Sequence, residues 1–177
     1  SLRCPEMFIT VRLMLESTPD GTWLGNALLR VLITPGGDVA RVVTATGRDA
    51  LGSSGHRLVA FRDLPRAWEA WDVNPDIQDA ALGEALPGGT VTVMEDGPLR
   101  ASVQVTRTFR DSTITQTVSV TAGSPRVDIH THADWQERRT LLKAFVDVNA
   151  RSDHATVETA YGAVRRPTHR NQPADAA

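Results

Sequence analysis

The sequence predicts an all-β protein, a large antiparallel β-sandwich with room for one short helix. Three observations indicate this class: apolar residues mostly recur at every second position, turn residues return about every ten residues, and helical periodicity is scarce. The chain has 177 residues, of which 41% are hydrophobic, enough for one large domain with a buried core. Its net charge of −2 gives no indication of a nucleic acid or an anionic membrane as a partner.

The first third of the chain predicts a lead-in followed by paired strands. Residues 1–20 are weakly patterned, although residues 7–15 have the composition of a strand. Residues 24–33 and 39–46 are apolar and are separated by a Thr-Pro-Gly-Gly-Asp turn, which predicts a strand, a turn and a strand. Residues 52–55, Gly-Ser-Ser-Gly, are interpreted as a flexible loop.

The short helix is expected over residues 74–86. Asn74 can cap its start, and Pro75 suits the first helical position because its missing N–H would have no helical partner there.

The rest of the chain predicts a series of strands joined by tight turns. Their expected ranges are 90–95, 101–110, 113–121, 126–135, 141–148 and 155–164. The three long strands over 101–110, 113–121 and 126–135 predict an antiparallel meander with one apolar face and one face rich in Thr and Arg.

Features of the chain as a whole suggest a fragment of a cytoplasmic protein. Cys4 is the only cysteine, so no disulfide can form within the chain. No apolar run approaches the roughly 20 residues of a membrane span. The start at Ser1 has no signal-peptide pattern, and the end at Ala177 has no terminating signal. We therefore expect both ends to be cuts in a longer reading frame.

The densest chemical pattern lies around Trp68, Glu69, Trp71 and Asp72. Indole rings can cover the apolar faces of a sugar, and carboxylates can accept hydrogen bonds from its hydroxyls. The alternative is that both indoles pack in the protein and the carboxylates anchor a loop. Two carboxylates three residues apart do not by themselves show the flanking geometry of a glycosidase.

A second candidate site lies near the C-terminus, at Arg166 and His169. Pro167 favours an extended backbone at Arg166, whose guanidinium can donate to sugar hydroxyls or to a carboxylate. The alternative is a structural ion pair. A catalytic triad with His169 is not predicted, because the sequence contains no Gly-x-Ser-x-Gly nucleophile elbow.

Asp128, His130, His132 and Asp134 alternate along one predicted strand and so share a face. A His-x-His pair on a strand can bind zinc. A polar, solvent-facing side of a sheet accounts for the same pattern, and no further ligand cluster accompanies it. We expect no metal site in this chain.

Five blocks of the sequence follow one another in an order typical of one enzyme family. They are Gly25-Asn26 through Ile33; Phe61, Asp63 and Pro65 followed by Trp68, Ala70, Trp71 and Asp72; Ser112 through Gln116; Asp134, Trp135, Glu137 and Arg138 with Leu142 and Lys143; and Tyr161-Gly162 with Arg166 through Asn171. With these blocks the chain resembles the α-mannosidases of glycoside hydrolase family 38, from about Leu24 to its C-terminus.

The resemblance implies a parent enzyme of several domains. Its N-terminal α/β barrel would carry the nucleophilic Asp, the acid/base and a divalent metal, usually zinc, and a three-helix bundle would follow. This chain resembles only the galactose-mutarotase-like β-sandwich after the bundle, over residues 21–177, truncated at its C-terminal end. The implied parent hydrolyses terminal α-mannosides by a retaining mechanism. The chain itself would hold no catalytic residue or metal.

In such a parent the sandwich would scaffold the barrel and line the rim of the site. Its partners would be the rest of the parent chain and an α-mannoside, in the bacterial cytoplasm. The substrate-binding candidates are Arg166, His169, Trp71 and Asp72. A strand missing after the last block would leave an open sheet edge that can pair with another copy of the chain, so a homo-oligomer is a further expectation.

Two departures and two alternatives accompany this interpretation. The family tends to have Asp where this chain has Glu69, and it has no habitual pair at His130 and His132. One alternative is an independent carbohydrate-binding sandwich with Trp68 and Trp71 as its platform. The other is an epimerase of the mutarotase type, because such an enzyme would have the same fold. A shared fold alone does not determine which function the chain has.

Overall fold

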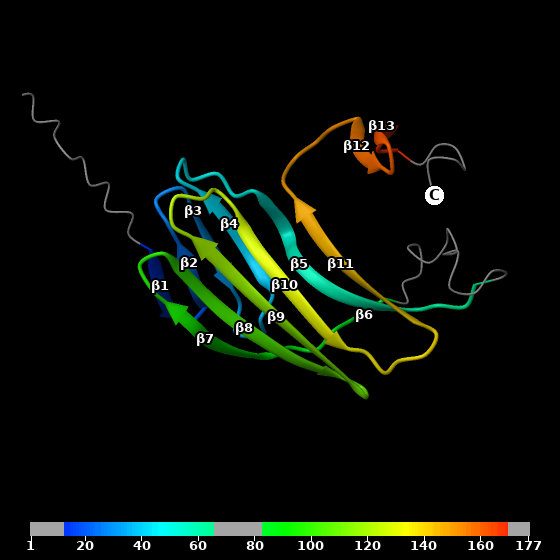
Figure 1. Cartoon of the computed structure of the whole chain (residues 1–177), viewed down its shortest axis with the longest axis horizontal. Coiled ribbons are helices and arrows are strands. Elements are labelled where there is room, and N and C mark those ends of the chain that lie inside the picture. Colours follow the sequence, from blue (N-terminus) through cyan, green and yellow to red (C-terminus); the bar gives the residue numbers. More distant parts are fainter. Residues whose placement is uncertain (1–12, 66–82, 170–177) are drawn as a thin grey trace, which may run out of the picture.

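A computed structural model of the chain describes residues 13–65 and 83–169, and all regular structure in these residues is β-strand (Figure 1). The strands are β1 (Met14–Thr18), β2 (Gly21–Gly25), β3 (Leu29–Ile33), β4 (Val39–Thr44), β5 (Leu51–Arg62), β6 (Glu84–Ala85), β7 (Thr90–Asp96), β8 (Arg100–Phe109), β9 (Ser112–Thr121), β10 (Val127–Asp134), β11 (Thr140–Val148), β12 (His154–Thr159) and β13 (Gly162–Pro167). The predicted all-β class is confirmed. None of the described residues belongs to a helix long and apolar enough to cross a membrane.

The strands form two facing sheets and a separate hairpin. The larger sheet has the order β1-β2-β3-β4-β5-β11, with β6 paired to β5, and the smaller sheet has the order β10-β9-β8-β7. All strand pairs are antiparallel. In Figure 1 the smaller sheet lies in front of the larger one, and the hairpin of β12 and β13 lies beyond the end of β11. The architecture is an antiparallel β-sandwich, as predicted.

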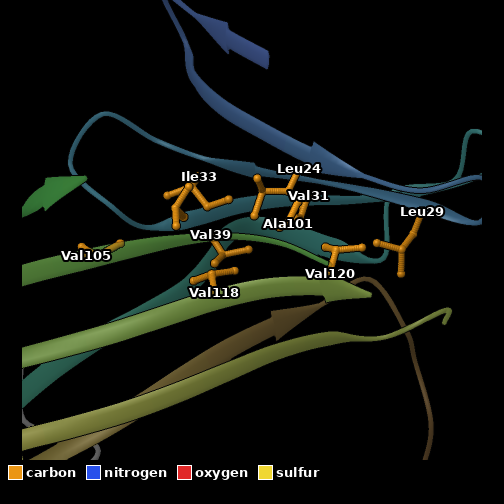
Figure 2. Close-up of a cluster of buried hydrophobic side chains, with 10 residues drawn as sticks. Leu24, Leu29, Val31, Ile33, Val39, Ala101, Val105, Val118 and Val120 are labelled. Carbon is orange, nitrogen blue, oxygen red and sulfur yellow. The ribbon is translucent and has the colours of Figure 1, made fainter. Parts of the chain in front are cut away.

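The main core fills the space between the sheets at the end where β2, β3 and β4 face β8 and β9 (Figure 2). Its buried members are Leu24, Leu29, Val31, Ile33, Val39, Ala101, Val103, Val105, Val118 and Val120. A second buried cluster, Leu58, Ala60, Leu86, Phe109 and Ile114, packs with Trp135 and Leu142. Branched and aromatic side chains dominate both clusters because they fit the pleated inner faces of a sandwich.

The segment 24–33, predicted as one strand, is a hairpin of β2 and β3. The turn is made by Asn26, whose Oδ1 accepts hydrogen bonds from the backbone N–H groups of Leu28 (2.8 Å) and Leu29 (3.0 Å). An Asn side chain can bond its own backbone two or three residues on and so replace the Gly-Pro chemistry of other turns. Because apolar residues surround Asn26, the sequence pattern does not indicate this turn.

The predicted loop at residues 52–55 is wrong, because these residues belong to the twelve-residue strand β5. At Gly52 the absence of a side chain leaves room for a residue of the neighbouring strand. A Cβ there would collide with the carboxylate of Asp147 on the neighbouring strand β11. The Gly-Ser-Ser-Gly composition therefore marks a close strand contact.

The predicted helix over residues 74–86 lies mostly outside the described residues. Where the chain is described again, Glu84–Ala85 forms β6 and pairs with Val59 and Ala60 of β5. This part of the prediction is wrong, because pairing with an existing strand satisfies the backbone groups that a helix would have satisfied.

The meander predicted over residues 101–135 is confirmed by the order β8-β9-β10, and β7 pairs with β8 as a fourth strand of this sheet. On β9, Ile114, Gln116, Val118 and Val120 are buried and form the inner face. The expectation that arginines lie on the outer face fails at Arg107, which is 2% exposed. Side chains alternate along a strand, and Arg107 lies on the same face of β8 as the buried apolar residues, so it points between the sheets.

Candidate functional site

Two of the four predicted site residues, Arg166 and His169, are described by the structure. Trp71 and Asp72 lie outside the described residues, as do Trp68 and Glu69. The described part of the candidate site is its C-terminal half.

The C-terminal half of the site is a β-hairpin. The segment 155–164, predicted as one strand, is divided into β12 and β13 by a two-residue turn at Ala160 and Tyr161. Every residue of β12 is exposed, as is every residue of β13 except the half-buried Pro167. Such a hairpin presents both faces to its surroundings instead of contributing to the core.

Side-chain and backbone hydrogen bonds close the open end of the hairpin. The backbone N–H of Thr168 donates to the carbonyl of Asp153 at 3.0 Å, and its hydroxyl donates to the carbonyl of Ser152 at 2.6 Å. Arg166 and His169 flank this closure, so the structure places both at the same end of the hairpin. Arg166 lies within β13, as its position before Pro167 predicts.

The register of the hairpin separates the two neighbouring arginines. Arg166 lies opposite Ala155, on the face that carries the exposed pair Val157 and Val164. Arg165 points to the other face, where its Nη2 lies 3.2 Å from Nδ1 of His154. The two guanidinium groups therefore serve different faces of the hairpin.

Tyr161 is a functional candidate that the sequence reasoning did not select. Its side chain is fully exposed at the tip of the hairpin. At a rise of roughly 3.3 Å per residue, the tip lies about 16 Å along β13 from Arg166. The signal in the sequence was an aromatic residue directly before Gly162, between two β-type segments.

The alternating acidic and His residues lie on β10, at an edge of the smaller sheet. Asp128 forms an ion pair with Arg126 at 2.8 Å, and Asp134 accepts a hydrogen bond from Gln136 at 2.6 Å. The described residues contain no group of three or more His, Cys, Asp and Glu side chains that could hold a metal ion. Solvent exposure of His130 and His132 accounts for the pattern.

Comparison with known proteins places this architecture in a family. Residues 24–177 match the family model described as "Glycosyl hydrolases family 38 C-terminal domain". The chain is 34% identical over 165 residues to "Alpha-mannosidase 2C1" of Homo sapiens, a match that covers 89% of this chain. It is 31% identical over 157 residues to "Alpha-mannosidase G" of Dictyostelium discoideum, covering 84% of this chain.

The structural comparison supports the fold. The chain superposes on an alpha-mannosidase from Enterococcus faecalis V583 with a TM-score of 0.69 at 15% identity, over 90% of this chain and 21% of that one. The chain spans 16% of the length of the human relative and 14% of the Dictyostelium relative. The chain is therefore similar to a limited part of each of these much longer proteins.

Proposed function

Because the chain belongs to the family of glycosyl hydrolase family 38 C-terminal domains, we propose that it is the β-sandwich portion of an α-mannosidase. The family match over residues 24–177 is the observation that carries this proposal. In the proposed enzyme, terminal α-mannosides are hydrolysed with retention through a covalent glycosyl-enzyme intermediate. The carboxylates of that reaction belong to other parts of the enzyme. The proposed location is the bacterial cytoplasm, in keeping with the single cysteine of the chain.

The proposed role of this portion is to scaffold the catalytic domain and to line the rim of the sugar site. The exposed hairpin of β12 and β13 supports this role, because it holds Arg166 and His169 at one end and outside both sheets. A guanidinium offers five donors in a rigid fork, which suits adjacent sugar hydroxyls or a catalytic carboxylate. Arg166 would bind and orient the substrate through these donors.

The divalent metal implied for the parent enzyme does not fit the described residues of this chain. They contain no suitable group of ligands, and the two His side chains of β10 lie on an exposed sheet face. A metal of the parent would therefore be held by residues other than those described.

The proposal is tested by substitution in the full-length enzyme, with an aryl α-mannoside as substrate. Arg166→Ala is expected to lower kcat/KM by roughly 10- to 100-fold, the loss typical of one charged hydrogen-bonding group at a site. Arg165→Ala is the matched control, because Arg165 lies on the opposite face of the same strand. It is expected to leave kcat/KM within about twofold. Equal effects of the two substitutions would contradict a substrate-binding role for Arg166.

A further inference from the structure

A cleft of about 320 Å³ lies at the end of the sandwich where β5 finishes and β11 begins. It is lined by Ala60, Phe61, Arg62, Leu64, Glu84, Arg110, Arg138, Arg139 and Thr140. Figure 1 shows the contributing segments together at the lower right: the end of β5, β6, the turn from β8 to β9 and the connection from β10 to β11. Residues far apart in the sequence thus bring four arginines to one cleft.

The described lining of the cleft has an excess of positive charge. Among the lining residues that the structure describes, Glu84 is the one carboxylate, and it pairs with Arg110 at 3.0 Å. The nearby Glu137 accepts hydrogen bonds from the backbone N–H of Asp111 (3.1 Å) and the hydroxyl of Ser112 (2.9 Å), and its other carboxylate oxygen lies 3.9 Å from Nη1 of Arg110. Arg110 is therefore paired with two carboxylates, and the excess of charge comes from the other three arginines. A cleft lined mainly by one sign of charge focuses the electric field and raises the local concentration of counter-ions.

Two of the four arginines have no side-chain partner in the described part of the chain. No hydrogen bond or ion pair there involves the guanidinium groups of Arg62 or Arg138, and both side chains are exposed. Ion pairing within the described residues therefore does not explain why arginines occupy these positions.

Backbone strain marks the same cleft. Among the described non-glycine residues, positive φ occurs at Arg110 (52°) and Arg139 (49°), and both line the cleft. Gly or Asn adopts this conformation at lower cost, and Arg there requires about 1 kcal/mol or more from the surrounding structure. Residues held in this way cluster at ligand sites, because the strain fixes the direction of a side chain.

We infer that this arginine-lined cleft binds a small oxyanion, a phosphate or carboxylate group. The planar guanidinium matches both groups through paired N–H···O hydrogen bonds. The volume is at the lower end of the range for ligand pockets, so the ligand is small. The apolar walls formed by Phe61 and Leu64 add surface for a short carbon skeleton. This inference does not depend on the proposed α-mannosidase activity.

The test is titration of the complete 177-residue chain with inorganic phosphate and, separately, with succinate. Ionic strength is held constant with sodium chloride, and binding is measured by calorimetry and by the rise in Tm. The expected result is saturable binding of at least one of the two anions. The more tightly bound anion identifies which of the two chemistries the site prefers.

Substitutions locate the binding. Arg62→Gln together with Arg138→Gln is expected to raise the dissociation constant at least about tenfold, while Arg151→Gln, an exposed arginine outside the cleft, leaves it unchanged. The single variant Arg138→Gln, with an intermediate effect, guards against a folding defect in the double variant, and urea unfolding checks both. Absence of saturable binding, or binding unaffected by these substitutions, overturns the inference.

Discussion

The guanidinium of Arg107 and the carboxylate of Asp38 form an ion pair at 2.8 Å that links the two sheets of the sandwich. Arg107 on β8 is 2% exposed, whereas Asp38, in the turn before β4, is 48% exposed. Arg107 also donates to the carbonyl of Pro87 at 3.0 Å. A buried positive charge is stable only while such acceptors surround it.

The asymmetry in burial predicts unequal effects of removing each partner. Asp38→Asn leaves the Arg107 charge buried and is expected to lower the free energy of unfolding by about 2 kcal/mol. Arg107→Met removes the buried charge, leaves Asp38 to water and is expected to cost less. Urea unfolding measures both, with Asp20→Asn in an exposed turn as the control. A larger loss for Arg107→Met would contradict this account.

His56 predicts a pH dependence of stability. Burial lowers its pKa from 6.5, and the nearby Arg107 adds to this, while Asp38 opposes it. The unfolded chain therefore binds the proton more readily than the folded protein. Stability is fully present above pH 6.5 and is lost as the pH falls from there toward the folded-state pKa.

The measurement is the free energy of unfolding between pH 7.5 and about pH 5. His56→Gln is expected to flatten the decline on acidification, because the buried titrating group is gone. His132→Gln, which alters an exposed imidazole, is expected to keep the decline. If His56→Gln retains the full slope, other groups cause it.

Asn26 connects the β2–β3 turn to the end of β9. Its amide Nδ2 donates to the carbonyls of Thr121 and Ser124, each at 2.8 Å, while Oδ1 accepts the two backbone bonds of its own turn. Asn26→Ala is expected to lower the free energy of unfolding by about 2–3 kcal/mol, since four hydrogen bonds are lost at once.

Asn26→Asp distinguishes the hydrogen bonds that Oδ1 accepts within the turn from those that Nδ2 donates to Thr121 and Ser124. It keeps the acceptor for the turn but sets a carboxylate against two carbonyl oxygens, so a loss similar to that of Asn26→Ala is expected at neutral pH. Partial recovery on protonation of the new carboxyl below about pH 4 is the distinguishing observation. Full stability of Asn26→Asp at pH 7 would show that the bonds to Thr121 and Ser124 contribute little.

Gly37 and Gly47 allow a comparison of how much stability is lost when a side chain is added at a turn glycine. Both have positive φ, 90° and 84°, but a Cβ at Gly37 would collide with the buried Val105, whereas a Cβ at Gly47 meets nothing within 4 Å. Gly47→Ala is expected to cost about 1 kcal/mol from backbone strain, and Gly37→Ala about 3 kcal/mol from strain and overpacking. Thermal unfolding compares them, and equal losses would exclude the packing contribution.

The parts of the fold that the sequence predicts are those in which local chemistry and tertiary packing agree. Apolar residues alternate with polar ones over most of strands β8 and β9, with Arg107 and Gln116 as the exceptions, and the turns carry strong signals, so the sequence predicts the meander. The hairpin at Asn26 was missed because one side chain makes the turn inside an apolar segment. Strand β5 was missed because Gly52 reflects a neighbour, Asp147, that only the tertiary structure supplies.

The candidate site divides in the same way. The extended backbone at Arg166 follows from Pro167 alone. Alternation along an extended segment sets Arg165 and Arg166 on opposite faces. Which residues share those faces depends on a turn at Ala160 and Tyr161 that alternation does not indicate. The arginine cleft was beyond prediction from sequence, since Arg62, Arg110 and Arg138 lie on segments that meet only in the folded chain.

The last prediction concerns activity. The purified 177-residue chain is expected to show no turnover of an aryl α-mannoside, with or without added zinc. The described residues contain no metal-ligand group, and the proposed function assigns the catalytic carboxylates to another part of the enzyme. Release of the aryl alcohol, measured beside an active α-mannosidase as the positive control, checks this.

Zinc-dependent turnover by the chain alone would contradict the proposal that the catalytic groups belong to another part of the enzyme. The face of β10 with Asp128, His130, His132 and Asp134 would then be the first place to look for the metal, because alternation sets these side chains on one side of the strand. His130→Ala with His132→Ala would abolish turnover if that face were responsible. The same pair of substitutions leaves an inactive chain inactive and its sandwich intact, since both side chains are exposed.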